Sequence, residues 1–139
     1  MKNNKNLQMK KSFATALLFM ICLSFTAFQC DDDKPLTQEE ELIHLQNLKS
    51  EIEVLASASV CNEATECKFI AFGSKPCGGP WSYLVYSTSI DINAFEALVN
   101  DYNMQEDTYN QRWGIASDCA LAQQPTSISC ENNTCMAVY

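Results

Sequence analysis

The sequence predicts an α+β domain with two helices on one face of an antiparallel sheet of about four strands, in the order α-β-β-α-β-β. Two long segments carry apolar residues at three- and four-residue spacing, which is typical of amphipathic helices. Four short segments are rich in aromatic and β-branched residues, and strands and helices do not alternate as a parallel sheet requires. Eight cysteines in 139 residues indicate covalent staples, because a domain of this size buries only a modest core.

The first helix is predicted to begin after Thr37. Thr37 and Glu40 have the spacing of a capping box, and the acidic run 39–41 suits the positive end of a helix. His44 lies just beside the apolar stripe and has no partner in the pattern, so it is interpreted as a surface or boundary residue and not as a catalytic base. The stripe covers about five turns and consists of Leu42, Leu45, Leu48, Ile52 and Leu55.

Two strands and a second helix follow. Residues 68–73 predict a short strand, and residues 81–89, with the sequence WSYLVYSTS, predict a longer one. Asp91 can cap the second helix, and Gly114 can end it. Trp113 lies near the end of this helix, and its apolar face consists of Phe95, Leu98, Tyr102 and Tyr109.

A hairpin is predicted at the C-terminus, from about residue 126 to residue 139. Asn132 and Asn133 suit a two-residue turn because Asn tolerates positive φ. Cys130 and Cys135 would then lie directly opposite each other, about 4.5 Å apart between Cα atoms, a separation that a disulfide accepts. The hairpin geometry therefore predicts a Cys130–Cys135 bridge.

Six cysteines outside the first thirty residues are predicted to form three disulfides. Beyond the hairpin pair, the remaining assignment follows only by elimination, with Cys61 to Cys67 and Cys77 to Cys119. The spacings are irregular, there is no Cys-x2-Cys pair, and the one histidine is far upstream, which argues against zinc. We therefore expect no metal and no cofactor. The six are Cys61, Cys67, Cys77, Cys119, Cys130 and Cys135.

The N-terminus has the pattern of an export signal. The first eleven positions contain four basic residues, and an apolar run of 16 residues follows at 13–28. This run is shorter than the roughly 20 residues that a spanning helix needs. An uncleaved membrane anchor is the alternative. Gln29 and Cys30 follow the run, and Asp31, Asp32 and Asp33 come directly after Cys30. This segment resembles the precursor of a bacterial lipoprotein of the Bacteroidota type, although Ala27 and Gln29 stand where the usual motif has Leu and a small residue.

The resemblance implies that residues 1–29 are a signal peptide and that Cys30 is lipidated. It further implies anchorage at the cell envelope, in the outer membrane, where the acidic run can direct the protein to the surface. Residues 30–36 then form an acidic tether, for which a plain solvated spacer is the alternative, and residues 37–139 form one cysteine-rich domain. Acyl chains contribute about 0.8 kcal/mol per buried methylene, so two or three chains hold a domain firmly on a membrane.

The charge of the exported part is strongly negative. Four of the nine basic residues lie in the signal and all 17 acidic residues follow it, so residues 31–139 carry a formal charge of −12. No basic patch is available to displace counterions from phosphate, which excludes nucleic acid as a partner. Solubility is the simplest role for this charge.

Two segments are candidate recognition surfaces. The segment 73–83, GSKPCGGPWSY, predicts a constrained loop that presents Trp81 and Tyr83, although a tight turn with Trp81 in the core is the favoured interpretation. On the second helix, one polar stripe could bind a small polar ligand, although a solvated face is favoured. This stripe consists of Asn103, Glu106 and Asn110.

These patterns favour binding or a structural role over catalysis. Nucleophilic catalysis needs an activated group with a base in reach, and the chain has one histidine and cysteines assigned to disulfides. The expected partners are the membrane, through the lipid on Cys30, and an unknown protein or small polar ligand. One alternative is a secreted proteinase inhibitor that presents the loop 73–81. A second is a small envelope hydrolase that uses paired carboxylates.

Overall fold

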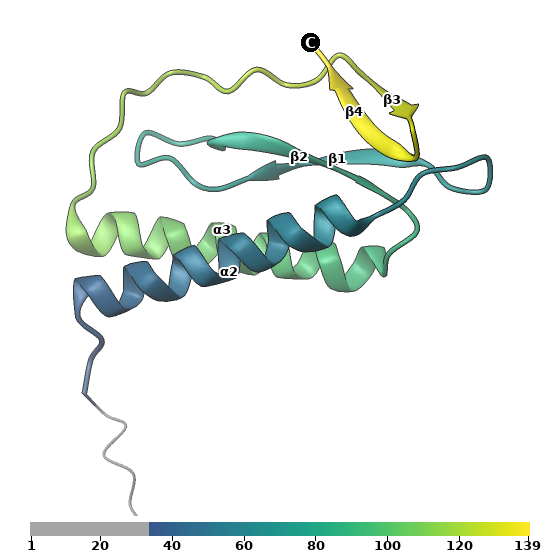
Figure 1. Cartoon of the computed structure of the whole chain (residues 1–139). Helices are drawn as coiled ribbons and strands as arrows, with labels where there is room; N and C mark the ends of the chain where they lie inside the picture. Colours follow the sequence, from purple (N-terminus) through teal and green to yellow (C-terminus); the bar gives the residue numbers. More distant parts are fainter. Residues whose placement is uncertain (1–33) are drawn as a thin grey trace, which may run out of the picture. The chain divides into compact units, whose positions relative to one another are not determined.

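The structure is a computed structural model that describes residues 34–139, and residues 36–139 form one compact unit. The predicted signal peptide and Cys30 lie outside the described residues. Figure 1 shows the arrangement of the elements. In chain order these are α2 (Gln38–Ala58), β1 (Cys67–Phe72), β2 (Ser82–Ser87), α3 (Ile92–Trp113), β3 (Ser127–Glu131) and β4 (Thr134–Val138).

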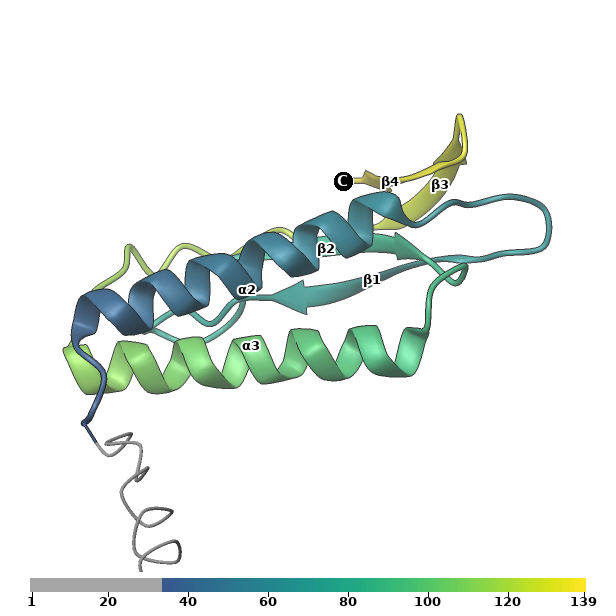
Figure 2. The same cartoon turned by 60° about the horizontal axis from the view of Figure 1, so that its bottom comes forward.

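The α+β class is confirmed, but the single four-stranded sheet is wrong. The strands form two separate antiparallel pairs, β1 with β2 and β3 with β4. The two helices lie side by side against one face of β1–β2, and the β3–β4 hairpin lies on the other side (Figures 1 and 2). The hairpin turns a cysteine-bearing face toward β1 and β2, not a backbone edge, so no ladder joins the two pairs.

Helix α2 begins at the predicted capping box. The Thr37 hydroxyl accepts a hydrogen bond from the Glu40 N–H at 3.3 Å, and the Glu40 carboxylate accepts one from the Thr37 N–H at 2.8 Å. The buried stripe is shifted slightly toward the C-terminal end of the predicted one, since Ala56 is buried while Leu42 and Leu55 are exposed at its edges. The residues of α2 that enter the core are Leu45, Ile52 and Ala56, with Leu48 packed against them.

Helix α3 also has the predicted ends. The Asp91 carboxylate caps it by accepting from the Ala94 N–H at 3.1 Å, and Gly114 ends it in the left-handed conformation with φ 59°. Aromatic rings join this helix to the sheet, since Tyr86 lies 4.7 Å from Phe95 between ring centroids. The core cluster consists of Leu45, Ile52, Ala56, Phe72, Tyr86, Phe95, Val99, Tyr102 and Tyr109.

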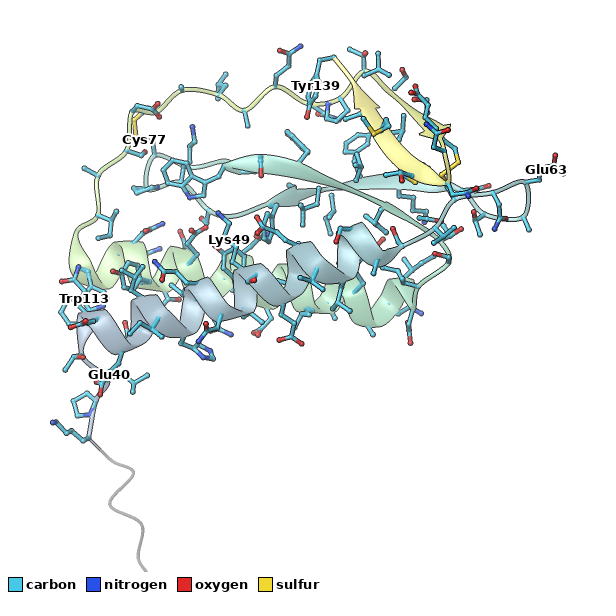
Figure 3. The ribbon with its side chains drawn as sticks, in the orientation of Figure 1. Glu40, Lys49, Glu63, Cys77, Trp113 and Tyr139 are labelled. Atoms are coloured by element: carbon cyan, nitrogen blue, oxygen red, sulfur yellow. A yellow bond between two sulfur atoms is a disulfide. The ribbon has the colours of Figure 1, made fainter. Side chains whose placement is uncertain are left out.

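The C-terminal hairpin has the predicted turn and register, but two of the predicted disulfides are wrong. Asn132 and Asn133 have φ values of 50° and 63°, and Cys130 lies opposite Cys135 in the register. Residues that lie opposite each other on two strands project from the same face of a hairpin. Here that face packs on β1 and β2, so the sulfurs of Cys130 and Cys135 both point toward these strands and not toward each other. The bridges are Cys61–Cys130 and Cys67–Cys135, while the third, Cys77–Cys119, is as predicted (Figure 3).

Candidate functional site

The loop 73–81 joins β1 to β2 and is folded tightly on itself. The Lys75 N–H donates to the Gly79 carbonyl and the Gly78 N–H donates to the Lys75 carbonyl, both at 2.8 Å. Gly78 and Gly79 have φ values of 91° and 80°, in the region that favours glycine. The Cys77–Cys119 bridge fixes the tip, which is exposed from residue 77 to residue 79. The loop is therefore a rigid feature with a solvent-facing tip.

The polar stripe of α3 holds the base of this loop. The Asn103 side chain accepts from the Gly73 N–H at 2.7 Å and donates to a carbonyl of β1 at 3.1 Å. The Glu106 carboxylate accepts from the Ser74 N–H at 2.5 Å, and the Asn110 amide donates to the Ser74 carbonyl at 2.7 Å. The three stripe residues are thus engaged by the backbone of the loop, in place of solvent.

The packing at Gly73 leaves no room for a side chain. Gly73 has φ 81°, and a Cβ atom there would lie 2.5 Å from Trp81 Cδ1 and 2.9 Å from a carboxylate oxygen of Glu106. That carboxylate is also held by the Tyr102 hydroxyl at 3.1 Å. Burial, and then the charge of Glu106, raise the pKa of Tyr102, so its hydroxyl stays a hydrogen-bond donor.

Lys75 ties the loop to the irregular segment that follows α3. Its side chain is buried, its ammonium group donates to the Ala120 carbonyl and lies 3.4 Å from the Asp118 carboxylate, and it sits 5.0 Å from the Trp81 ring centroid. A hydrogen bond from the Ala120 N–H, followed by the charge of Lys75, lowers the pKa of Asp118. The ammonium group is thus directed inward and is not presented at the loop tip.

The Trp81 ring does not fill the core, so the favoured sequence interpretation of this residue is wrong. Trp81 is 42% exposed because the Lys75 stem and Gly73 occupy its inner side and leave the rest of the ring at the surface. It lines a shallow groove of about 310 Å³ together with Tyr83 and the C-terminal residue Tyr139, which is 59% exposed. The full lining is Trp81, Ser82, Tyr83, Ala122, Gln123 and Tyr139. We call this the aromatic groove.

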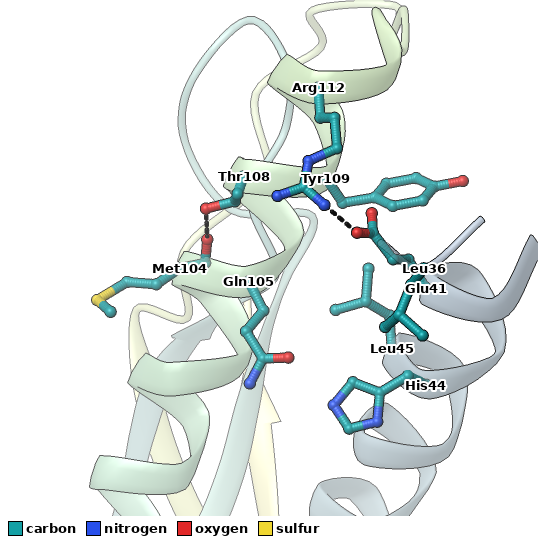
Figure 4. Close-up of a pocket in the computed structure, with 9 residues that line it drawn as sticks. All are labelled: Leu36, Glu41, His44, Leu45, Met104, Gln105, Thr108, Tyr109 and Arg112. Atoms are coloured by element: carbon teal, nitrogen blue, oxygen red, sulfur yellow. Dashed lines mark hydrogen bonds and ion pairs between the residues drawn. The ribbon is translucent and has the colours of Figure 1, made fainter. Parts of the chain in front are cut away.

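A second hollow, of about 360 Å³, lies between the start of α2 and the C-terminal half of α3 (Figure 4). An ion pair between Glu41 and Arg112 closes one end of it, and Trp113 Nε1 donates to the same carboxylate at 2.7 Å. His44 lies at its rim and is exposed, in keeping with a boundary residue. The lining is Leu36, Glu41, His44, Leu45, Met104, Gln105, Thr108, Tyr109 and Arg112.

The structure gathers the predicted recognition residues into one region but in two roles. Trp81 and Tyr83 line the aromatic groove, while Asn103, Glu106 and Asn110 support the loop behind it. Sequence reasoning missed Lys75, Gln123 and Tyr139. The only sequence signal for Lys75 is its place as a lone lysine in a Gly/Pro-rich loop. No local pattern marks Gln123 or Tyr139, because residues far apart in the chain form this groove.

Comparison with protein-family models, with curated proteins and with solved structures finds no match to the chain. Neither helix of the described residues 34–139 combines the length and the apolar character needed to cross a membrane.

Proposed function

We propose that the chain is a lipid-anchored domain of the cell envelope that acts by binding a partner at the aromatic groove. The observation that carries this proposal is the partial exposure of three aromatic side chains, Trp81, Tyr83 and Tyr139, beside a loop fixed by a disulfide and by α3. Partly exposed aromatic rings on a soluble domain provide large contact area with few rotatable bonds, and rigid surroundings reduce the entropy lost on binding.

The groove suits an unknown protein or a small polar ligand. Amide and hydroxyl groups of Gln123, Ser82 and Tyr83 share its lining with the rings, so a ligand can stack and form hydrogen bonds at the same place. The negative charge of residues 31–139 favours a neutral or basic partner over a nucleic acid.

Site-specific crosslinking at the surface of intact cells tests the groove as the binding site. A photoreactive amino acid at Gln123, in the groove, is compared with one at Gln46, an exposed glutamine on α2. We expect one discrete crosslinked species from position 123, and we expect Trp81→Ala to reduce its yield at least several-fold. Equal yields from both positions, or a yield that Trp81→Ala leaves unchanged, would overturn the groove as the site.

The lipid anchor is tested separately, at Cys30. Cys30→Ser should abolish incorporation of labelled fatty acid, while Cys22→Ser, a matched change inside the apolar run, should leave it intact. Labelling that survives Cys30→Ser would reject the lipoprotein assignment without affecting the groove. The two parts of the proposal can therefore fail independently.

A proteinase inhibitor is the second candidate, because the exposed tip at residues 77–79 belongs to a loop whose backbone is fixed on both sides. The inward direction of Lys75 means that the recognised residues would be those of the tip. Inhibition of a panel of serine and cysteine proteases, lost in Cys77→Ser/Cys119→Ser, would support this function. No inhibition by the intact protein would reject it. The hydrolase alternative has less support among residues 34–139, since Glu106, the carboxylate nearest to the loop, accepts hydrogen bonds on both oxygens from the Ser74 N–H and the Tyr102 hydroxyl.

A further inference from the structure

Four cysteines meet where the hairpin joins β1. The Sγ atoms of Cys61, Cys67 and Cys135 all lie within 4.8 Å of one another. Cys130 is bonded to Cys61 and is the cross-strand partner of Cys135, so its side chain projects from the same face of the hairpin. Three of the sulfur atoms therefore form one cluster, which two separate parts of the chain supply, and the Cys130 sulfur joins it through its bond to Cys61.

The dimensions of this cluster suit a tetrahedral metal. A Zn–S bond of about 2.3 Å places the sulfurs of a four-cysteine site roughly 3.8 Å apart, and the Sγ atoms of Cys61, Cys67 and Cys135 already lie within 4.8 Å of one another. Cys61 and Cys135 are buried, with 0% and 5% of their surface exposed, whereas Cys67 is half-buried and Cys130 is exposed, so the site is open to solvent on the Cys130 side. The Cys61 N–H donates to the Asn133 carbonyl at 3.0 Å, which holds the two contributing segments together independently of the sulfurs.

We infer that Cys61, Cys67, Cys130 and Cys135 form a zinc(II) site when their two disulfides are reduced. A dithiol reductant supplies two electrons and two protons to each S–S bond, which gives four thiols, and is itself oxidised to a disulfide. Zinc then forms four Zn–S bonds while the four thiols release four protons to solvent. The bound metal and its thiolates carry a net charge of −2.

The spacing of the cysteines hides this site in the sequence. The pairs are separated by five and four intervening residues instead of two, so the sequence pattern alone argues against zinc. In the fold, however, each pair projects its sulfurs toward the other. The metal would then replace the two disulfides as the link between hairpin and sheet, and binding would stabilise the fold.

Cobalt titration of the protein, reduced with dithiothreitol without metal and desalted under anaerobic conditions, tests this inference. Tetrahedral cobalt thiolate gives strong visible absorption that zinc bleaches on displacing it. We expect one equivalent of cobalt to bind in the wild type and in Cys77→Ser/Cys119→Ser, which keeps the four cysteines. Cys67→Ser should weaken binding by at least about 100-fold, because even changes outside the ligand shell cost roughly 10- to 100-fold in affinity.

Circular dichroism shows whether each variant is folded, and Cys135→Ser repeats the test from the other strand. Absence of a tetrahedral spectrum in both wild type and the Cys77→Ser/Cys119→Ser variant would overturn the inference. A spectrum that needs Cys77 or Cys119, or one that persists unchanged in both Cys67→Ser and Cys135→Ser, would overturn it as well. None of these outcomes depends on the aromatic groove or on Cys30.

Discussion

The loop 73–81 and the C-terminal hairpin cover opposite ends of the same sheet and are held there by different means. The loop is held by amide and carboxylate groups of α3, by a buried lysine and by one disulfide. In β3 and β4 only Cys135 is buried, and two disulfides attach these strands to the rest of the domain. A small domain can thus fix one peripheral element mainly by polar packing and another mainly by covalent bonds, with the hydrogen bond from the Cys61 N–H to the Asn133 carbonyl in addition.

Removal of both hairpin disulfides should have the largest effect. While one bridge is intact, the other closes a ring of only about a dozen residues. Cys67→Ala/Cys135→Ala, which removes one bridge, should therefore lower the free energy of unfolding by about 3 kcal/mol. Loss of Cys61–Cys130 as well should bring the total to roughly 7 kcal/mol, comparable with the whole stability of a small domain. Urea unfolding measures the free energy of unfolding of both variants. If removal of both bridges lowers it no more than removal of one, the disulfides are not what holds the hairpin.

Gly73→Ala should have the next largest effect, because it combines positive φ with a collision against Trp81 and Glu106. We expect a loss of about 2–4 kcal/mol. Gly78→Ala is the matched control, since its φ of 91° is equally unfavourable but nothing lies within 4 Å of the added carbon, and it should cost about 1–2 kcal/mol. Equal losses in thermal or urea unfolding would show that packing at residue 73 is not tight.

Asn110→Ala probes the polar attachment of the loop. Asn110 is 6% exposed and donates to the Ser74 carbonyl, so its removal should cost about 1–3 kcal/mol. Gln111→Ala, one residue along and exposed, removes only a surface hydrogen bond to Asp107 and should change stability by less than about 0.5 kcal/mol. The Ser74 N–H, which donates to Glu106 beside this contact, should exchange faster in Asn110→Ala alone. Similar exchange rates in the two variants would contradict the role of the Asn110 side-chain amide.

The smallest effect concerns the pH dependence of the Lys75 contact. Because the folded pKa of Asp118 is lowered, its contribution to stability is present above the ordinary aspartate pKa of about 3.9 and is lost as pH falls through the folded value. Asp118→Asn should remove this dependence. In Lys75→Met the pKa of Asp118, followed by NMR titration, should rise part of the way, since the Ala120 N–H still donates to the carboxylate. No rise at all would show that the lysine charge is not felt there.

Both helices could be predicted from the sequence because their signals are local. A capping box and an apolar stripe identify α2, and an aspartate cap, an aromatic face and a terminal glycine identify α3. The Asn132–Asn133 turn was equally local. The pairing of strands into sheets was not, because it depends on which face of the hairpin meets β1 and β2.

The cysteines show most clearly what could not be predicted from the sequence. The opposed positions of Cys130 and Cys135 were predicted correctly, yet proximity within the hairpin did not decide the bond, since both sulfurs face Cys61 and Cys67. The residues of the candidate site could also be predicted only in part. Trp81 and Tyr83 stood out in their segment, whereas Tyr139 joins them only because the C-terminus returns to the loop.

Disulfide mapping of the unreduced protein by mass spectrometry tests most directly whether the hairpin is attached to the sheet by covalent bonds. Cleavage by trypsin and a glutamate-specific protease cuts after Lys68, Glu66 and Glu131, which separates Cys67, Cys130 and Cys135 into different peptides. We expect the peptide 132–139 to be linked to the dipeptide 67–68 through the Cys67–Cys135 bridge. Linkage of 132–139 to the peptide that contains Cys130 would contradict it, and the hairpin would then be closed on itself instead of being bonded to the sheet.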